Sequence, residues 1–121
     1  MRMAPLRDRT KSLAVRVIRM YSSLPNTRLA HVLGQQALRS GTSVAANFRE
    51  APRARSDREF VAKLGLVEQE IDELALWCDL LTEAKLVRPK RLSPLQAEIE
   101  ELLRIVVTTV TRTKKGRRRS A

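Results

Sequence analysis

The sequence contains few of the residue types that build metal sites, disulfides and aromatic surfaces. Cys78 is its only cysteine and His31 its only histidine, which excludes an intrachain disulfide and leaves a Cys/His zinc site without enough ligands. Aromatic residues make up only 3% of the chain, so few are available to stack on bases. No Gly-rich phosphate loop and no Glu-x-x-His motif of a di-iron bundle is present. We therefore expect neither a cofactor nor a metal.

Long hydrophobic runs are also missing. No apolar stretch approaches the roughly 20 residues that cross a bilayer, and residues 1–5 lack the apolar segment of a secretory signal. We therefore expect a cytoplasmic protein with no membrane partner. Catalysis is not expected either, because His31 has no nucleophile or orienting group at a recognisable spacing.

Basic residues, in contrast, are abundant and unevenly distributed. The chain has 24 Lys and Arg against 13 Asp and Glu, which gives a net charge of +11. Residues 1–49 hold nine bases and one acid, residues 50–101 eight bases and twelve acids, and residues 102–121 seven bases and no acid. A positive charge of this size favours a polyanionic partner, although it says nothing about the fold.

Hydrophobic spacing divides the chain into four amphipathic helices, at about 6–23, 27–50, 56–84 and 93–113. The third is the clearest: Ser56 and Glu59 have the form of a capping box, and apolar residues then recur at intervals of four and three. In the fourth, Ser93 is expected to cap the helix, with Pro94 at the first helical position.

Short connections between helices of similar length favour antiparallel neighbours. The sequence therefore predicts an all-α fold, an antiparallel up-down-up-down four-helix bundle. We place this bundle in residues 1–113 and expect residues 114–121 to form a basic, disordered tail.

The small and polar residues of segment 40–47 allow two interpretations. Small side chains let helix backbones approach closely, with hydroxyls bonded back to carbonyls of their own helix. Alternatively, Asn47 and Glu50 meet Arg53 or Arg55 in a polar network that fixes the corner between the second and third helices.

Two pairs of apolar residues lie off the main hydrophobic faces: Val15 with Ile18, and Trp77 with Leu80. They fit either a broad core or a subunit interface. Residues 64–84 hold six acids and no base, whereas the first helix is basic, so these two helices are expected to pair within the bundle or between subunits. Pairing between different surfaces of two subunits is heterologous and closes into a ring.

One stretch carries a resemblance to a known family. Residues 36–51, QALRSGTSVAANFREA, resemble the signature of a bacterial family of four-helix-bundle proteins encoded in intervening sequences of large-subunit ribosomal RNA genes, and the match continues through 53–60, 62–68, 73–77 and 80–84. Accessory proteins of diversity-generating retroelements look like relatives. The resemblance implies an up-down bundle and a ring-shaped homopentamer. It also implies, for the retroelement relatives, binding of nucleic acid and a reverse transcriptase through a basic surface.

This chain departs from the family pattern at Ala51, where a glycine is often found, and the bases of 114–119 lie beyond the matched region.

The leading functional hypothesis is a non-catalytic oligomer that binds RNA or DNA through phosphate contacts. No helix-turn-helix or zinc-finger signature is present, so we expect non-specific recognition. The alternative is a ring-shaped scaffold for a protein partner, in which the tail only aids solubility; attraction to anionic lipid ranks last. The candidate nucleic-acid-binding residues are Arg7, Arg9, Lys11, Arg16, Arg19, Lys114, Lys115, Arg117, Arg118 and Arg119.

Overall fold

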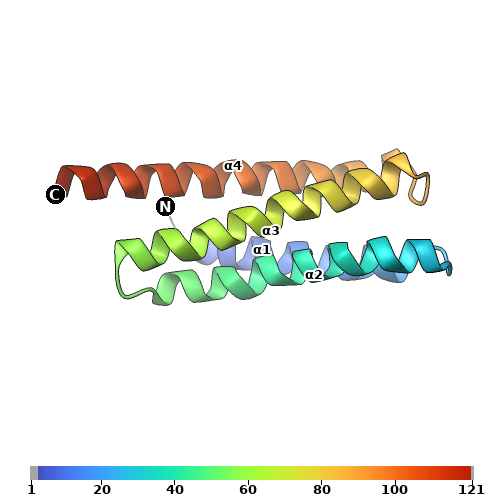
Figure 1. Ribbon diagram of the computed structural model, residues 1–121, viewed down its shortest axis with the longest axis horizontal. Coiled ribbons are helices and arrows are strands. Elements are labelled where there is room, and N and C mark those ends of the chain that lie inside the picture. The colour runs from blue at the N-terminus through green and yellow to red at the C-terminus, as the bar shows by residue number, and fades with distance from the viewer. Residues whose placement is uncertain (1–2, 121) are drawn as a thin grey trace.

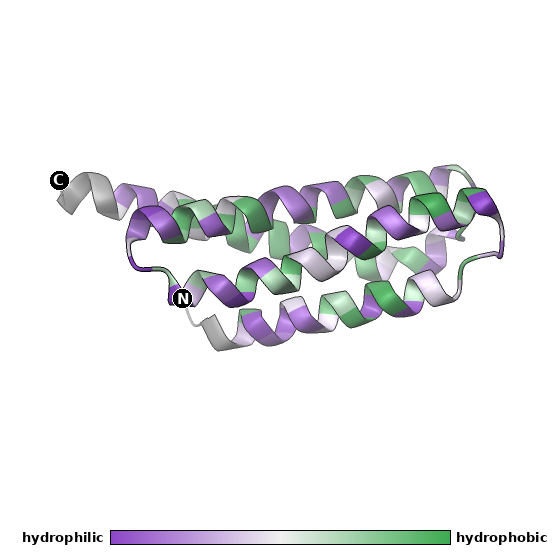
Figure 2. Cartoon of the chain, turned by 60° about the horizontal axis from the view of Figure 1, so that its bottom comes forward, coloured by the Kyte–Doolittle hydropathy of each residue, from purple (hydrophilic) through white to green (hydrophobic). Residues whose placement is uncertain are grey.

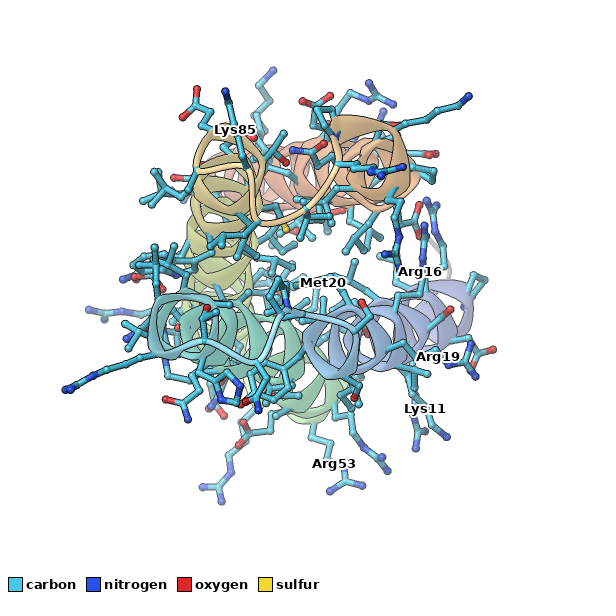
Figure 3. The ribbon with its side chains drawn as sticks, turned by 90° about the vertical axis from the view of Figure 1, so that its right-hand side faces the viewer. Lys11, Arg16, Arg19, Met20, Arg53 and Lys85 are labelled. Atoms are coloured by element: carbon cyan, nitrogen blue, oxygen red, sulfur yellow. The ribbon has the colours of Figure 1, made fainter. Side chains whose placement is uncertain are left out.

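A computed structural model describes residues 3–120, and all of its regular elements are helical. They are α1 (Met3–Ser22), α2 (Arg28–Glu50), the single 3₁₀ turn η1 (Ala51–Arg53), α3 (Asp57–Glu83) and α4 (Pro89–Ser120). Each α-helix runs antiparallel to the next (Figure 1). Seen end-on, they stand at the corners of a square in the order α1, α2, α3, α4 (Figure 3). The predicted up-down-up-down four-helix bundle is confirmed.

The two ends of the bundle differ in what they contain. The α1–α2 and α3–α4 connections lie together at one end, which we call the loop end (Figure 1). The α2–α3 connection and both chain termini lie at the opposite end. Neighbouring helices pack extensively along their length, except that α1 and α4 touch at few positions. The interface between the first and last helices is therefore the loosest in the bundle.

Side-chain caps begin the second and third α-helices where the sequence predicts. The Thr27 hydroxyl accepts a hydrogen bond from the backbone N–H of Ala30 at 3.2 Å. The Ser56 hydroxyl accepts one from the N–H of Glu59 at 3.1 Å. Each cap satisfies one of the N–H groups that a helix start leaves without a partner.

The start of α4 differs from the prediction. The helix begins at Pro89, about one turn before the expected cap at Ser93, and Pro94 lies inside it. Proline at the first helical position is favourable because its fixed φ suits the helix. The earlier start turns Leu92 into the core, where it is only 2% exposed. Pro94 cannot donate to the carbonyl of Lys90, and the Ser93 hydroxyl donates to that oxygen instead, at 3.4 Å.

The end of α4 also differs from the prediction. The helix continues to Ser120, so residues 114–120 are helical where a disordered tail is expected, and α4 overhangs the rest of the bundle (Figure 1). The preceding β-branched stretch favours strand by propensity alone. Its threonines counter this by donating to carbonyls four residues earlier: Thr109 to Ile105, Thr111 to Val107 and Thr113 to Thr109, at 2.8–3.0 Å. The division of the chain at residue 113 stays a prediction.

Apolar residues from all four α-helices form one core between them. Hydrophobic and hydrophilic positions alternate around each helix (Figure 2). Phe48 is the largest fully buried side chain. The apolar series predicted for α3 is buried throughout except at its first member, Phe60, which is half-buried. Its buried members are Leu64, Val67, Ile71, Leu74, Cys78 and Leu81.

The apolar face of α2 is narrower at its start than the spacing indicates. Leu29, whose spacing from Leu33 and Ala37 would place it on the core face, is 56% exposed, and Ala30 is buried in its place. Small residues are needed here because Tyr21 of α1 and Leu24 of the α1–α2 connection lie against Gly34. Their side chains occupy the space that a larger residue on α2 would fill.

The small residues in the middle of α2 bring its backbone close to α1. A Cβ placed on Gly41 would lie 2.9 Å from a methyl group of Val17. The Thr42 hydroxyl donates to the carbonyl of Leu38 at 2.9 Å, within its own helix. These contacts support the interpretation of close packing with hydroxyls bonded back to the helix.

The polar network predicted at the α2–α3 corner does not form among the residues that the structure describes. Asn47 donates to the carbonyl of Ser43 at 3.0 Å, within α2. Glu50 pairs with Lys63 of α3, at 3.2 Å between carboxylate oxygen and Nζ. Arg55 is exposed instead of joining them. The corner is held by a different ion pair because Lys63 lies two turns into α3, on the side that faces the end of α2.

None of the described helices combines the length and the hydropathy that a membrane crossing requires.

Candidate nucleic-acid interface

Arg9 has partners within its own subunit, unlike the other bases predicted on α1. Its Nε and Nη2 atoms donate to the two carboxylate oxygens of Glu98 on α4, at 3.2 and 2.6 Å. Nη2 also lies 3.3 Å from Glu101. The hydrogen bonds to Glu98 are the main cause of a raised pKa at Arg9. Arg9 therefore bridges α1 and α4, and a phosphate would have to compete with these carboxylates for its guanidinium group.

Arg7 and Lys11 lie on the outer side of α1, where they line a cleft of about 340 Å³ with Arg49 of α2. The Lys11 side chain points away from the bundle (Figure 3). Asp8 lines the same cleft and reduces its positive charge. This part of the predicted surface is exposed and basic, but it contains an acid.

Arg16 and Arg19 belong to a second surface, at the loop end. With Arg91 of α4 they line a cleft of about 270 Å³ between α1 and α4, which we call the arginine cleft. Arg16 lies between the two helices (Figure 3). The apolar part of the lining comes from Met20, Val87, Leu92 and Leu95. No acidic residue lines this cleft.

An adjoining cleft of about 380 Å³ extends the basic surface across the α3–α4 connection. Ser23, Val87 and Arg91 line both clefts, so the two are continuous. The second adds Lys85 and Arg88. We call the five bases that line the two clefts the basic end cluster: Arg16, Arg19, Lys85, Arg88 and Arg91.

The end of α3 positions the first base of the connection. Lys85 has a φ of 62°, in the left-handed region where a glycine usually ends a helix. Its N–H donates to the carbonyl of Thr82 at 3.0 Å, and the next N–H, of Leu86, donates to Leu81 at the same distance. A lysine adopts this conformation at a cost of about 1–2 kcal/mol, because its Cβ crowds the following carbonyl. The turn therefore places the charged side chain of Lys85 directly after the end of α3.

The positive charge at the loop end comes from side chains. Two helix N-termini, of α2 and α4, lie there beside two C-termini, of α1 and α3. Their dipoles have opposite directions and largely cancel. The two segments that meet there, residues 16–31 and 84–97, hold seven bases and no acid. Among the described residues, no ion pair within 4.0 Å involves the basic end cluster.

The sequence analysis missed Lys85, Arg88 and Arg91. They lie in the stretch 50–101, whose overall charge is negative because it also contains the acids of α3. A shorter window shows the signal, since residues 84–97 contain four bases and no acid. Only the fold reveals that this segment lies beside residues 16–31.

The C-terminal bases form a separate site. Lys114 and Lys115 are exposed on the overhanging part of α4. The side chains of Arg117, Arg118 and Arg119 lie outside the part of the chain whose side chains the structure describes. At 1.5 Å per residue along α4, Lys114 is roughly 35 Å from Arg91. The two ends of the molecule therefore present two distinct basic surfaces.

The residues predicted at a subunit interface lie on two different faces. Val15 and Ile18 of α1 are 38% and 44% exposed. Trp77 and Leu80 of α3 are half-buried, and the Trp77 Nε1 atom is buried without a hydrogen-bond partner among the described residues. Because α1 and α3 stand at diagonal corners, the two pairs do not form one patch (Figure 3).

The acidic surface of α3 has its partner on α2. Arg39 bridges Glu70 at 3.2 Å and Glu73 at 3.3 Å. The hydrogen bond to Glu70 is the main cause of a raised pKa at Arg39. The basic α1 is diagonal to α3, so these two helices do not pair within a subunit (Figure 3). Pairing of these two helices between subunits stays a prediction.

The residues that most often carry chemistry have structural surroundings here. The His31 ring lies edge-on to Tyr21, with 6.1 Å between the ring centroids. Cys78 is buried in the core. Residues 3–120 contain no group of three or more His, Cys, Asp or Glu side chains placed to hold a metal ion.

Comparisons with known proteins agree with this architecture. A family model described as 23S rRNA-intervening sequence protein matches residues 6–108. A crystal structure of a protein of unknown function from the S23 ribosomal protein family of Bacteroides thetaiotaomicron is similar, with a TM-score of 0.85 and 29% sequence identity. The likeness covers 92% of this chain and 99% of that one. No curated protein matches the chain.

Proposed function

The chain belongs to the 23S rRNA-intervening sequence protein family, and from that premise we propose that it is a non-catalytic, oligomeric, cytoplasmic protein that binds RNA or DNA by its phosphates. The observation that carries this proposal is the basic end cluster. Five cations converge on two continuous clefts, and no acid lines either of them. Cations that lack partners in the folded protein are free to replace the counterions of a nucleic acid.

The predicted contacts on α1 and at the C-terminus remain part of the proposal, apart from Arg9. Arg7, Lys11, Lys114 and Lys115 are exposed. They extend the positive surface beyond the loop end. The binding mode we propose is contact with the backbone, since the side chains of the basic end cluster come from two helix ends and a loop and match no fold that reads base edges.

Oligomerisation is a second part of the proposal. Val15 and Ile18 form an exposed apolar pair on α1, and Leu66 and Leu76 are 46% and 51% exposed on α3. Apolar groups on two diagonal helices suit a heterologous contact, in which one face of a subunit meets a different face of the next. The remaining acids of α3 would then lie near the bases of α1 in the neighbouring subunit. Such an assembly would repeat the basic surface around a ring.

The alternative is a ring-shaped scaffold whose partner is a protein. The observation that favours it is the number of large apolar side chains left exposed on all four α-helices, which suits a protein surface better than a phosphate backbone. They are Val15, Ile18, Leu29, Val32, Leu66, Leu76 and Val107.

Fluorescence anisotropy of labelled RNA and DNA, titrated at several salt concentrations, tests the proposal. Three proteins are compared: the full chain, a truncation ending at Thr113, and the double variant Arg88→Gln/Arg91→Gln. We expect affinity to fall steeply with salt for the full chain. Removing one cation that binds a phosphate reduces the slope of log K against log[salt] by about 0.7–0.9. The double variant should therefore flatten it by about 1.4–1.8.

Two results would overturn part or all of the proposal. If the truncation flattens the slope and the double variant does not, the C-terminal end of α4 is the binding surface and the loop end is not. Arg53→Gln/Arg58→Gln serves as the matched control, because it removes the same charge from two exposed arginines near the α2–α3 connection that are not among the proposed contacts. If the full chain binds neither RNA nor DNA at low salt, the proposal is wrong and the scaffold is left.

A further inference from the structure

We propose that the arginine cleft accepts an unstacked base of a single strand, while the neighbouring cations of the basic end cluster hold its phosphates. This inference rests on the proposed function and adds the class of nucleic acid: single strands and unpaired ends rather than continuous duplex. It is carried by the shape of the site and by its apolar lining, which a surface that only binds phosphates does not need.

The cleft exists because α1 and α4 pack loosely. Arg9 ties the two helices together near the N-terminus of α1 through Glu98. Two turns further along α1, toward the loop end, Arg16 lies between the helices without an ion-pair partner among the described residues (Figure 3). The cleft that opens there holds about 270 Å³, or about nine water volumes at ~30 Å³ each. That is room for one flat ring system.

The lining of the cleft fits a nucleobase. Met20 and Val87 are half-buried and present apolar atoms, and Leu92 and Leu95 close the bottom. A base that leaves its stack needs apolar or planar surfaces on which to lie, and guanidinium planes serve this purpose in proteins that bind single strands. Arg16, Arg19 and Arg91 supply such planes around the opening.

The surroundings of the cleft fit the backbone that carries the base. Lys85 and Arg88 line the adjoining cleft on one side, and Arg19 is exposed on the other. A strand that places one base in the arginine cleft would therefore meet a cation both before and after that base. The bases of a duplex are stacked and paired, so a duplex could offer phosphates and base edges to the same surface, but not the free face of a base.

The test uses three labelled DNA probes with equal numbers of phosphates, measured by fluorescence anisotropy with the full chain at one moderate salt concentration. They are an unstructured single strand, an abasic single strand and a closed hairpin duplex. We expect the natural single strand to bind about fivefold more tightly than the abasic strand, which is the lower end of what one stacked base contributes. Comparison with the abasic strand isolates the contribution of the bases to affinity, because the abasic strand keeps the flexibility and the charge of the natural one.

Two variants test whether the preference for the natural strand arises in the arginine cleft. Ser23 lines both clefts, and Ser23→Leu adds apolar bulk there with no change of charge. Ser22→Leu is the matched control: Ser22 is also exposed, its hydroxyl donates to the carbonyl of Ile18 just as that of Ser23 donates to Met20, and it lines neither cleft. Ser23→Leu should remove the preference for the natural strand and leave the affinity for the abasic strand within about twofold. Ser22→Leu should change neither affinity.

The outcomes distinguish this inference from the function on which it rests. Equal affinity for the natural and abasic strands would overturn the inference alone, even if Ser23→Leu failed to fold. A preference that survives Ser23→Leu in a folded protein would place the base elsewhere and would also overturn it. Absence of binding to all three probes would overturn the proposed function as well. Competition by an acidic peptide as strong as that by the natural strand would assign the cleft to a protein partner.

Discussion

Gly41 and Gly65 both lie inside long helices, but their surroundings are opposite. A Cβ on Gly41 would lie within about 3.0 Å of three atoms of Val17, whose branched side chain cannot easily move aside. A Cβ on Gly65 would meet nothing within 4 Å. Replacement of glycine by alanine is therefore expected to have opposite effects on stability at the two positions.

We expect Gly41→Ala to lower the free energy of unfolding by about 1–3 kcal/mol, because overpacking forces α1 and α2 apart. Gly65→Ala should raise it by about 0.5–1 kcal/mol, since alanine restricts the unfolded chain and favours helix. Urea denaturation measures both. Val17→Ala in the Gly41→Ala background should recover part of the loss. Equal destabilisation by both alanines would show that Gly41 does not set the spacing between the helices.

The buried thiol of Cys78 makes stability depend on pH in the alkaline range. Burial, with a smaller contribution from the charge of Asp79, raises the pKa of Cys78 from 9.0 to about 12. The unfolded chain loses this proton near pH 9, whereas the folded protein keeps it until about pH 12. The contribution of the group to stability is therefore fully present below pH 9 and is lost as the pH rises toward 12.

Between those values, the loss attributable to Cys78 should be about 1.4 kcal/mol per pH unit. Urea denaturation on both sides of pH 9 measures it in the wild type and in Cys78→Ala, which is less stable at neutral pH because of the cavity it creates. The variant should lose less stability with pH than the wild type. Parallel pH profiles for the two proteins would contradict the assignment.

Among the helices, α4 is the one whose boundaries depend most on tertiary contacts. Pro94 interrupts its hydrogen bonds one turn after its start, and the Ser93 hydroxyl, at 3.4 Å, is a weak substitute for the missing N–H. We expect Pro94→Ala to raise the free energy of unfolding by about 1 kcal/mol, because it restores the bond to the carbonyl of Lys90. Thermal unfolding followed by circular dichroism measures the change. A lower melting temperature would mean that Pro94 makes an unrecognised packing contact.

The third helix shows how far sequence alone can go. Its cap and its apolar repeat are local signals, and both agree with the structure because nothing distant competes with them. The predicted start of α4 is wrong because Pro89 and Pro94 each fit the first helical position. The burial of Leu92 decides between them, and burial is a property of the assembled bundle.

The candidate site is less predictable than the helices for the same reason. Charge counts locate the bases of α1, but they cannot reveal that Arg9 faces Glu98, which is 89 residues away in sequence. Nor can they show that residues 85–91 complete the surface begun by Arg16 and Arg19. A surface made from two helix ends depends on how the helices are arranged in space. The hydrophobic spacing of the sequence predicts each helix, but it does not predict which helix ends lie side by side.

For the whole molecule, the proposed oligomer gives a direct test of the exposed apolar surface. Ile18→Asp places a charge on the exposed pair of α1 and should reduce the sedimentation coefficient of the assembly, because a buried unpaired carboxylate opposes association. Ser22→Asp, one turn along the same helix and also exposed, is the control. If the two variants sediment alike while both stay helical, α1 is not part of the interface.

The loose packing of α1 against α4 has a consequence for the order in which the protein is made. Within residues 3–120, α1 is synthesised first and α4 last, so their interface is the last one of this bundle that can form. Until then, the faces of α1, α2 and α3 that surround Leu92, Leu95, Ile99 and Leu102 remain uncovered. Until α4 is made, the other three helices form an open layer with one apolar side. Docking of α4 is the step that closes the bundle.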